Sequence, residues 1–190
     1  RLVGELHEAD AGDLIEALDP DLRPQLIELM GKDFDFSALT EVDDTVREDI
    51  LDELKPETVA EGVRELDSDD AVYILEDLDR QEQDEILQQL PTVERVALER
   101  SLTYPEESAG RRMQTEFIAV PPSWNVGQAI DYLRETVDLP ERFYELYVVD
   151  GDQKLLGAVA LDRLLRTKRP VPVMDLMDED RRKVRATDDQ

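Results

Sequence analysis

An apolar residue recurs at every twelfth position through the first hundred residues, and this register limits what the chain can fold into. A fixed short period indicates one small structural unit stacked repeatedly, and such units bury their apolar faces only against their neighbours. We therefore expect an array of such units. The apolar positions are Leu6, Leu18, Met30, Val42, Leu54, Leu66, Leu78, Leu90 and Leu102.

Each unit is predicted to be one short helix followed by a tight turn. Apolar pairs such as Ile74–Leu75 precede the twelfth positions by three and four residues, which is helical spacing. Turn formers follow, as in Asp19-Pro20-Asp21 and Lys55-Pro56-Glu57. Proline suits the first turn of a helix because its missing N–H needs no partner there, and early acidic side chains favour the positive helix end. We expect roughly eight helices over residues 1–103.

The net charge of -26 is concentrated in this array. Residues 1–103 carry 31 acidic and 9 basic residues, a balance of -22, whereas residues 104–190 carry 17 and 13, a balance of -4. So negative a surface repels phosphate backbones, and we expect no nucleic acid as a partner. Cations are favoured instead. An acidic surface that only keeps the protein soluble is the alternative.

Composition excludes several classes of protein. Without cysteine there is no disulfide framework and no thiolate metal site, which suits a reducing compartment. No apolar run approaches the roughly 20 residues that span a bilayer. His7 is the only histidine and is expected at the surface or as a helix cap, so we expect no enzyme. The chain begins without methionine and stops in mid-pattern, which suggests a piece of a longer protein.

After Leu102 the periodicity changes to that of a small α/β unit. Strands are predicted at Phe117–Val120, Leu146–Val149 and Leu155–Leu161, with a helix capped by Asn125 and another at Asp162–Arg166. The start of this unit then repeats. Met113-Gln114-Thr115-Glu116 and its strand are echoed 64 residues later by Met177-Asp178-Glu179-Asp180 and a predicted strand at Arg181–Val184.

A β-α-β-β-α unit repeated in tandem resembles the CBS (cystathionine beta-synthase) domain. More specific strings are Tyr104-Pro105-Glu106-Glu107-Ser108-Ala109-Gly110 and Met113 to Val120, which follow the acidic array. Together they resemble the cytosolic part of the MgtE family of magnesium channels. This resemblance implies a multidomain α and α/β protein, a right-handed superhelix of short helices followed by CBS domains. We expect the superhelix at 1–103, a hinge at 104–112, the first CBS domain at 113–176 and a truncated second one at 177–190.

The resemblance also implies a function. It implies a Mg²⁺ sensor on the cytoplasmic side of the cell membrane that pairs as a homodimer through its CBS domains, beneath its own transmembrane domain. Mg²⁺ would bridge the acidic surfaces of the helical and CBS domains and favour a closed channel. Two acidic surfaces repel one another, and a hard divalent cation held by carboxylates and water removes that repulsion. Alternatives are a helical scaffold that binds a basic protein and a nucleotide-responsive CBS regulator.

The resemblance also suggests metal ligands. By ungapped comparison Asp69 falls at a Mg²⁺ ligand position of the family, with Asp70 beside it, and Tyr73 stands where some members carry another acid. Glu106 and Glu107 in the hinge are further candidates. Alternatively, Asp67 or Ser68 caps a helix while the following aspartates complement its dipole.

Nucleotide binding is tested against the residues that usually contact ribose in CBS domains. That signature places a serine or threonine three residues after a strand glycine, and an aspartate three further on. Counting from Gly157, these positions hold Ala160 and Arg163. Both polar groups are missing, so we expect no nucleotide to bind through this half-site.

Overall fold

The computed structural model describes residues 6–137, 139–140, 142–178 and 183–189. The chain divides into two compact units, which are described separately: residues 1–115 with 185–190, and residues 116–184. No helix in the described ranges is long and apolar enough to cross a membrane.

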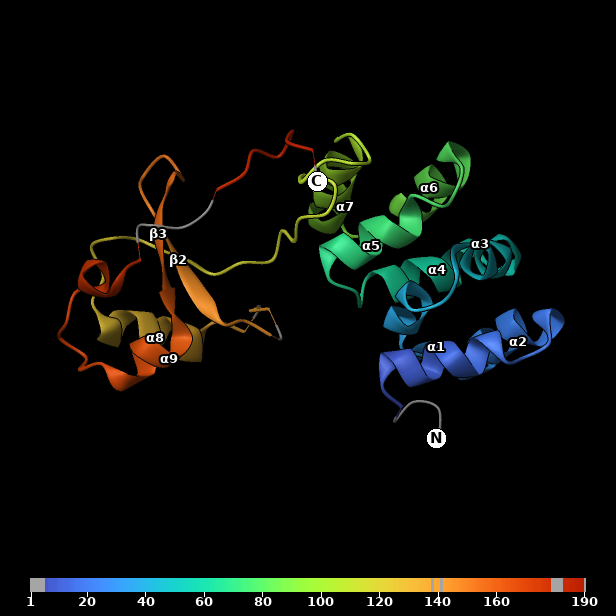
Figure 1. Ribbon diagram of the computed structural model, residues 1–190, viewed down its shortest axis with the longest axis horizontal. Coiled ribbons are helices and arrows are strands. Elements are labelled where there is room, and N and C mark those ends of the chain that lie inside the picture. Colours follow the sequence, from blue (N-terminus) through green and yellow to red (C-terminus); the bar gives the residue numbers. More distant parts are fainter. Residues whose placement is uncertain (1–5, 138, 141, 179–182, 190) are drawn as a thin grey trace. The chain divides into compact units, whose positions relative to one another are not determined.

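The first unit is a succession of short helices, and its described part holds seven α-helices. They follow one another in layers, from α1 and α2 to α6 and α7 (Figure 1). Short 3-10 turns lie between them at Pro20–Leu22, Gly31–Asp33 and Phe36–Thr40. The helices are α1 (Glu8–Glu16), α2 (Arg23–Met30), α3 (Asp44–Glu53), α4 (Pro56–Val63), α5 (Ser68–Leu75), α6 (Arg80–Leu87) and α7 (Thr92–Leu102).

The predicted array of short helices is confirmed, and the twelve-residue register marks where helices end. Leu54 directly follows α3, and Leu78 and Leu90 lie just beyond the ends of α5 and α6. All three are buried in the core of this unit. Helix starts follow the expected chemistry: Asp79 forms a capping box with Glu82 at the start of α6, and Pro56 opens α4. Each helix therefore buries one apolar face against its neighbours, as a stacked array requires.

The stretch from Gly31 to Thr40 departs from one α-helix per unit. Gly31, with φ of +52°, ends α2, and two 3-10 turns replace the next helix. Phe34 and Phe36 supply the burial instead, with ring centroids 5.6 Å apart and nearly perpendicular planes. A Cβ on Gly62 of α4 would stand 2.2 Å from the Phe36 ring, so glycine there makes room for that ring.

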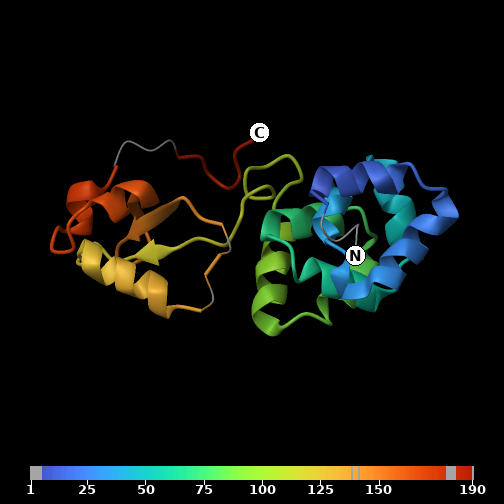
Figure 2. The same cartoon turned by 90° about the horizontal axis from the view of Figure 1, so that it is seen from below.

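The second unit is a three-stranded sheet with two helices beside it. β1 (Ala119–Val120) pairs in parallel with β2 (Glu145–Val149), which pairs antiparallel with β3 (Leu155–Ala160). α8 (Val126–Glu135) and α9 (Leu161–Arg166) lie side by side (Figure 1, Figure 2). The predicted β-α-β-β-α order is confirmed, although the first strand is shorter than expected. Asn125 caps α8 in a capping box with Gln128.

The end of the chain returns to the first unit. After a 3-10 turn at Val173–Leu176, Asp178 forms a bridge with Ala158 of β3. Further on, the backbone carbonyls of Ala186 and Asp188 accept hydrogen bonds from the N–H groups of Gly110 and Ala109, at 2.8 and 2.9 Å. The predicted strand at 181–184 lies partly outside the described residues, since 179–182 are not among them. The predicted domain boundaries stay a prediction.

Candidate metal site

A hollow of about 620 Å³ lies at the start of α5, within the first unit. The acidic first turn of the helix forms one wall, and the segment that follows α7 forms the other. Asp69, Asp70 and Tyr73 come from α5, whereas Ala109, Arg112 and Met113 come from the segment. The fold thus brings the two predicted aspartates to a shared opening, next to a guanidinium group.

The Asp69 side chain carries a polar atom that lacks a partner. Its Oδ1 oxygen is shielded from solvent and accepts no hydrogen bond within the described part of the chain. Buried oxygen atoms nearly always have a hydrogen-bond partner, and a carboxylate oxygen that lacks one costs free energy. A bound cation would satisfy this oxygen.

Asp70 lies in a strongly negative surrounding. Partial burial raises the pKa of its carboxyl group to about 6, assisted by the negative charges of Asp69, Asp67, Glu8 and Glu41. Its charged form is therefore less favourable in the folded chain than in the unfolded chain.

The alternative that Asp67 or Ser68 serves mainly as a helix cap accounts for only part of what these two side chains do. Asp67 is the N-cap residue of α5, yet its carboxylate makes no capping hydrogen bond to the helix. It accepts a hydrogen bond from Nε2 of Gln114 at 3.1 Å instead. The hydroxyl of Ser68 accepts a bond from the backbone N–H of Thr115 at 2.8 Å. Both side chains thus fasten the segment after α7 to the start of α5.

At the other end of α5, Glu76 is fully engaged with two arginines. Its Oε2 lies 3.1 Å from Nε of Arg111, and its Oε1 lies 2.6 Å from Nη1 of Arg112. Arg111 is buried and also donates to the carbonyl of Leu102 at 2.5 Å. One negative charge therefore faces two positive ones, which leaves a local excess of one positive charge.

A buried arginine of α3 completes the surroundings of Tyr73. Arg47 is 1% exposed and pairs with Asp77 and with Asp44, the latter at 3.0 Å. Burial lowers its pKa, but the hydrogen bond and charge of Asp77, with a contribution from Tyr73, outweigh burial and raise it. Its guanidinium carbon lies 4.2 Å from the centroid of the Tyr73 ring, and that of Arg112 lies 5.4 Å from it. Tyr73 also donates a hydrogen bond to Asp44 at 3.2 Å.

The two hinge candidates lie elsewhere. Glu106 and Glu107 are exposed in a turn closed by a hydrogen bond from Ser108 N–H to the Pro105 carbonyl, at 3.0 Å. Neither is among the described residues that line the hollow at α5. Sequence reasoning did not identify Arg47 or Arg112. An available signal was a pair of adjacent arginines, Arg111 and Arg112, directly after a strongly acidic region.

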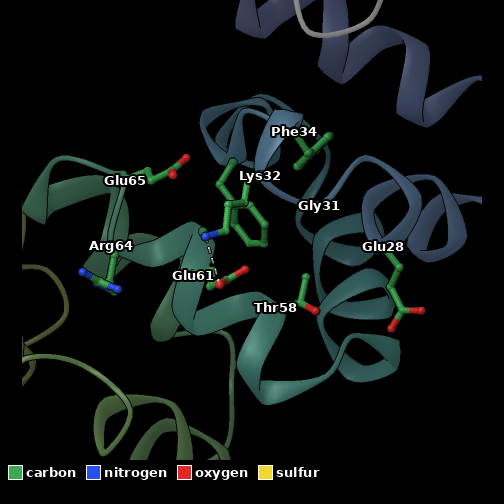
Figure 3. Close-up of a pocket in the computed structure, with 10 residues that line it drawn as sticks. Glu28, Gly31, Lys32, Phe34, Thr58, Glu61, Arg64 and Glu65 are labelled. Atoms are coloured by element: carbon green, nitrogen blue, oxygen red, sulfur yellow. Dashed lines mark ion pairs between the residues drawn. The ribbon is translucent and has the colours of Figure 1, made fainter. Parts of the chain in front are cut away.

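A second hollow, of about 470 Å³, lies between α2 and α4, and its charges are mixed (Figure 3). Lys32 points toward Glu61, with Nζ 3.8 Å from Oε1, and Glu28 pairs with Lys55 at 3.0 Å. Because Glu28 and Glu61 already have lysine partners, whereas Oδ1 of Asp69 lacks a partner among the described residues, this hollow offers less attraction to a cation than the one at α5.

The residues at α5 fit a magnesium ion. Among the described residues, no group of three or more acidic, histidine or cysteine side chains is placed to hold a metal. Mg²⁺ is usually held by only one or two carboxylates and keeps several of its waters. Asp69 and Asp70 would supply these carboxylates, and water would complete the coordination.

Each half of the chain matches the model of a known protein family. The family model described as the MgtE intracellular N domain matches residues 6–107, and the CBS domain model matches residues 109–169. The magnesium transporter MgtE of Enterococcus faecalis is 33% identical over 89 residues, which cover 47% of this chain and 20% of that protein. The Bacillus subtilis MgtE is 26% identical over 116 residues, covering 61% and 26%. The chain thus matches about a quarter or less of these relatives.

Solved structures agree with this assignment. The crystal structure of the cytosolic domain of the Mg²⁺ channel MgtE in complex with ATP has a TM-score of 0.85 at 24% identity, covering 99% of this chain and 77% of that one. The soluble part of a magnesium transporter has a TM-score of 0.79 at 27% identity, covering 99% and 74%. With the helical array matched by the MgtE model and the sheet unit by the CBS model, the chain belongs to the MgtE family.

Proposed function

We propose that this chain is the cytosolic Mg²⁺-sensing region of a membrane magnesium transporter and acts by binding the ion rather than by catalysis. The relatives that it matches are named magnesium transporters, which supports Mg²⁺ as the transported ion. The observation that carries the proposal is the shielded Oδ1 of Asp69, which lacks a hydrogen-bond partner beside the second carboxylate of Asp70.

The proposed mechanism is electrostatic. Mg²⁺ held by Asp69 and Asp70 lowers the repulsion among the carboxylates of the array and lets acidic surfaces of the helical and CBS domains come together. In the whole transporter, a homodimer through the CBS domains on the cytoplasmic side of the membrane, this closure favours the closed channel. Glu106 and Glu107 are second candidates for carboxylates that respond to closure.

Isothermal titration calorimetry of the 190-residue chain with MgCl₂ tests the site. We expect saturable binding, which Asp69→Asn weakens about tenfold or more because the ion loses a charged ligand. NaCl at matched ionic strength should give no saturable heat. Asp49→Asn, which removes one exposed carboxylate from α3, serves as the charge-matched control. Equal affinity in the wild type and Asp69→Asn, or no saturable binding at all, would refute the site.

ATP is the comparison ligand in this titration, because a solved MgtE cytosolic domain was crystallised with it. In this chain Ala160 and Arg163 replace the usual ribose contacts, and the position of Gly157 is covered by Met177 and Asp178. We expect no saturable heat with ATP. Saturable ATP binding without a response to Mg²⁺ would favour the nucleotide-responsive regulator instead.

A further inference from the structure

Arg112 shares the hollow at α5 with the two aspartates, and its charge is only partly compensated. Within the described part of the chain its one ion-pair partner is Glu76, which is already bonded to the buried Arg111. The Arg112 side chain is 37% exposed, whereas that of Arg111 is 8% exposed. Of the two guanidinium groups, that of Arg112 is therefore the one that lines the hollow.

We propose that Arg112 is a tethered cation that competes with Mg²⁺ for the carboxylates of Asp69 and Asp70 and thereby sets the ion concentration to which the site responds. The proposal rests on the magnesium site described above. A guanidinium group carries one positive charge and, unlike a free cation, cannot leave the hollow, because the chain holds it. A divalent ion entering the hollow is repelled by this charge and must overcome it.

The geometry limits where Arg112 can move. The guanidinium groups of Arg112 and Arg47 both lie near the Tyr73 ring, at 5.4 and 4.2 Å from its centroid. Glu76 holds Arg112 from the far end of the helix at 2.6 Å. Mg²⁺ in the hollow therefore favours the arrangement in which the guanidinium stays paired with Glu76. Since Ala109 and Met113 line the same hollow, ion entry also acts on the segment that leads out of the first unit at Thr115.

Two substitutions with opposite expected signs test the competition, with Mg²⁺ binding measured by calorimetry. Arg112→Gln removes the competing charge, so the dissociation constant for MgCl₂ should fall about three- to tenfold. Glu76→Gln leaves two arginines without their carboxylate, so the constant should rise by a similar factor. Arg95→Gln on α7 makes the same change in net charge as Arg112→Gln and should shift the constant less than about twofold. The Arg112→Gln effect should shrink as KCl is raised.

The outcomes distinguish a failure of the proposed competition by Arg112 from a failure of the proposed magnesium site. Thermal unfolding first verifies that each variant is folded at the temperature of titration. If Asp69→Asn weakens binding but Arg112→Gln leaves it unchanged or weaker, the site stands and the competition is wrong. A shift of the same sign in Arg112→Gln and Glu76→Gln also contradicts competition, because lost packing alone would act in one direction. If Asp69→Asn does not weaken binding, the magnesium site itself fails.

Discussion

The two ends of α5 hold their carboxylates in opposite ways. At the C-terminal end, Glu76 pairs with Arg111 and Arg112, and Asp77 of the following turn pairs with the buried Arg47. At the N-terminal end, Asp69 has a shielded oxygen without a partner and the pKa of Asp70 is raised to about 6. Helix dipoles alone predict the reverse, since acids are stabilised at the N-terminus. The chain thus pairs the carboxylates at the C-terminal end with its own arginines, whereas the N-terminal end is where we propose that an external cation binds.

The largest expected effect on stability comes from Arg47, the buried arginine that pairs with Asp77 just beyond α5. Arg47→Met should lower the free energy of unfolding by about 3–5 kcal/mol, because it leaves the carboxylate of Asp77 largely buried without its cation. Urea denaturation in EDTA measures this loss. Arg95→Met, which removes a half-exposed pair with Glu99, should cost below about 1 kcal/mol. Equal losses in the two variants would show that Arg47 is not a structural counter-ion.

A smaller loss of stability is expected when Glu76, whose carboxylate pairs with both Arg111 and Arg112, is neutralised. Glu76→Gln should lower the free energy of unfolding by about 2 kcal/mol, since the buried Arg111 loses its carboxylate partner and retains its hydrogen bond to the Leu102 carbonyl. The same denaturation experiment measures it. Glu99→Gln on α7 is the matched control and should change stability by about 0.5 kcal/mol or less. A neutral result for Glu76→Gln would remove the contrast between the two ends.

The smallest expected effect is a gain in stability, and it concerns Asp70 at the N-terminal end of α5. The folded chain binds the Asp70 proton more tightly than the unfolded chain does, because the pKa is raised to about 6. The free energy of unfolding therefore falls as pH rises from about 4 to about 6, and the full penalty is present above that range. With allowance for solvent screening, Asp70→Asn in EDTA should gain about 1 kcal/mol at pH 7.5 and close to nothing at pH 4.

Asp49→Asn, on the exposed face of α3, controls for the lower net charge of that variant. Its effect is subtracted at each pH. A gain for Asp70→Asn that is equal at both pH values, or a loss at pH 7.5, would mean that Asp70 carries no electrostatic penalty in the folded chain.

Much of the fold could be predicted from the sequence because burial there follows a simple period. The twelfth positions mark helix ends, and β2 (Glu145–Val149) and β3 (Leu155–Ala160) lie within one residue of the strands predicted at 146–149 and 155–161. The Gly31–Thr40 stretch could not be predicted, since its burial depends on two phenylalanine rings fitting against a glycine of another helix.

The candidate site was predictable only in part. The resemblance pointed to Asp69 and Asp70, and the structure places both at one hollow. Arg47 and Arg112 were missed, because a charged residue in a buried or shared position breaks the apolar pattern rather than contributing to it. Their partners, Asp77 and Glu76, lie 30 and 36 positions away, and no local spacing links such pairs.

The return of residues 185–189 to the first unit has a mechanical consequence. The chain leaves that unit at Thr115 and rejoins it at Arg185, and the rejoining stretch is bonded to Ala109 and Gly110. These hydrogen bonds join two stretches that lie about 75 positions apart in the sequence. A pull on residues 185–189 therefore reaches the backbone at 109–110, immediately before the two arginines that bind Glu76.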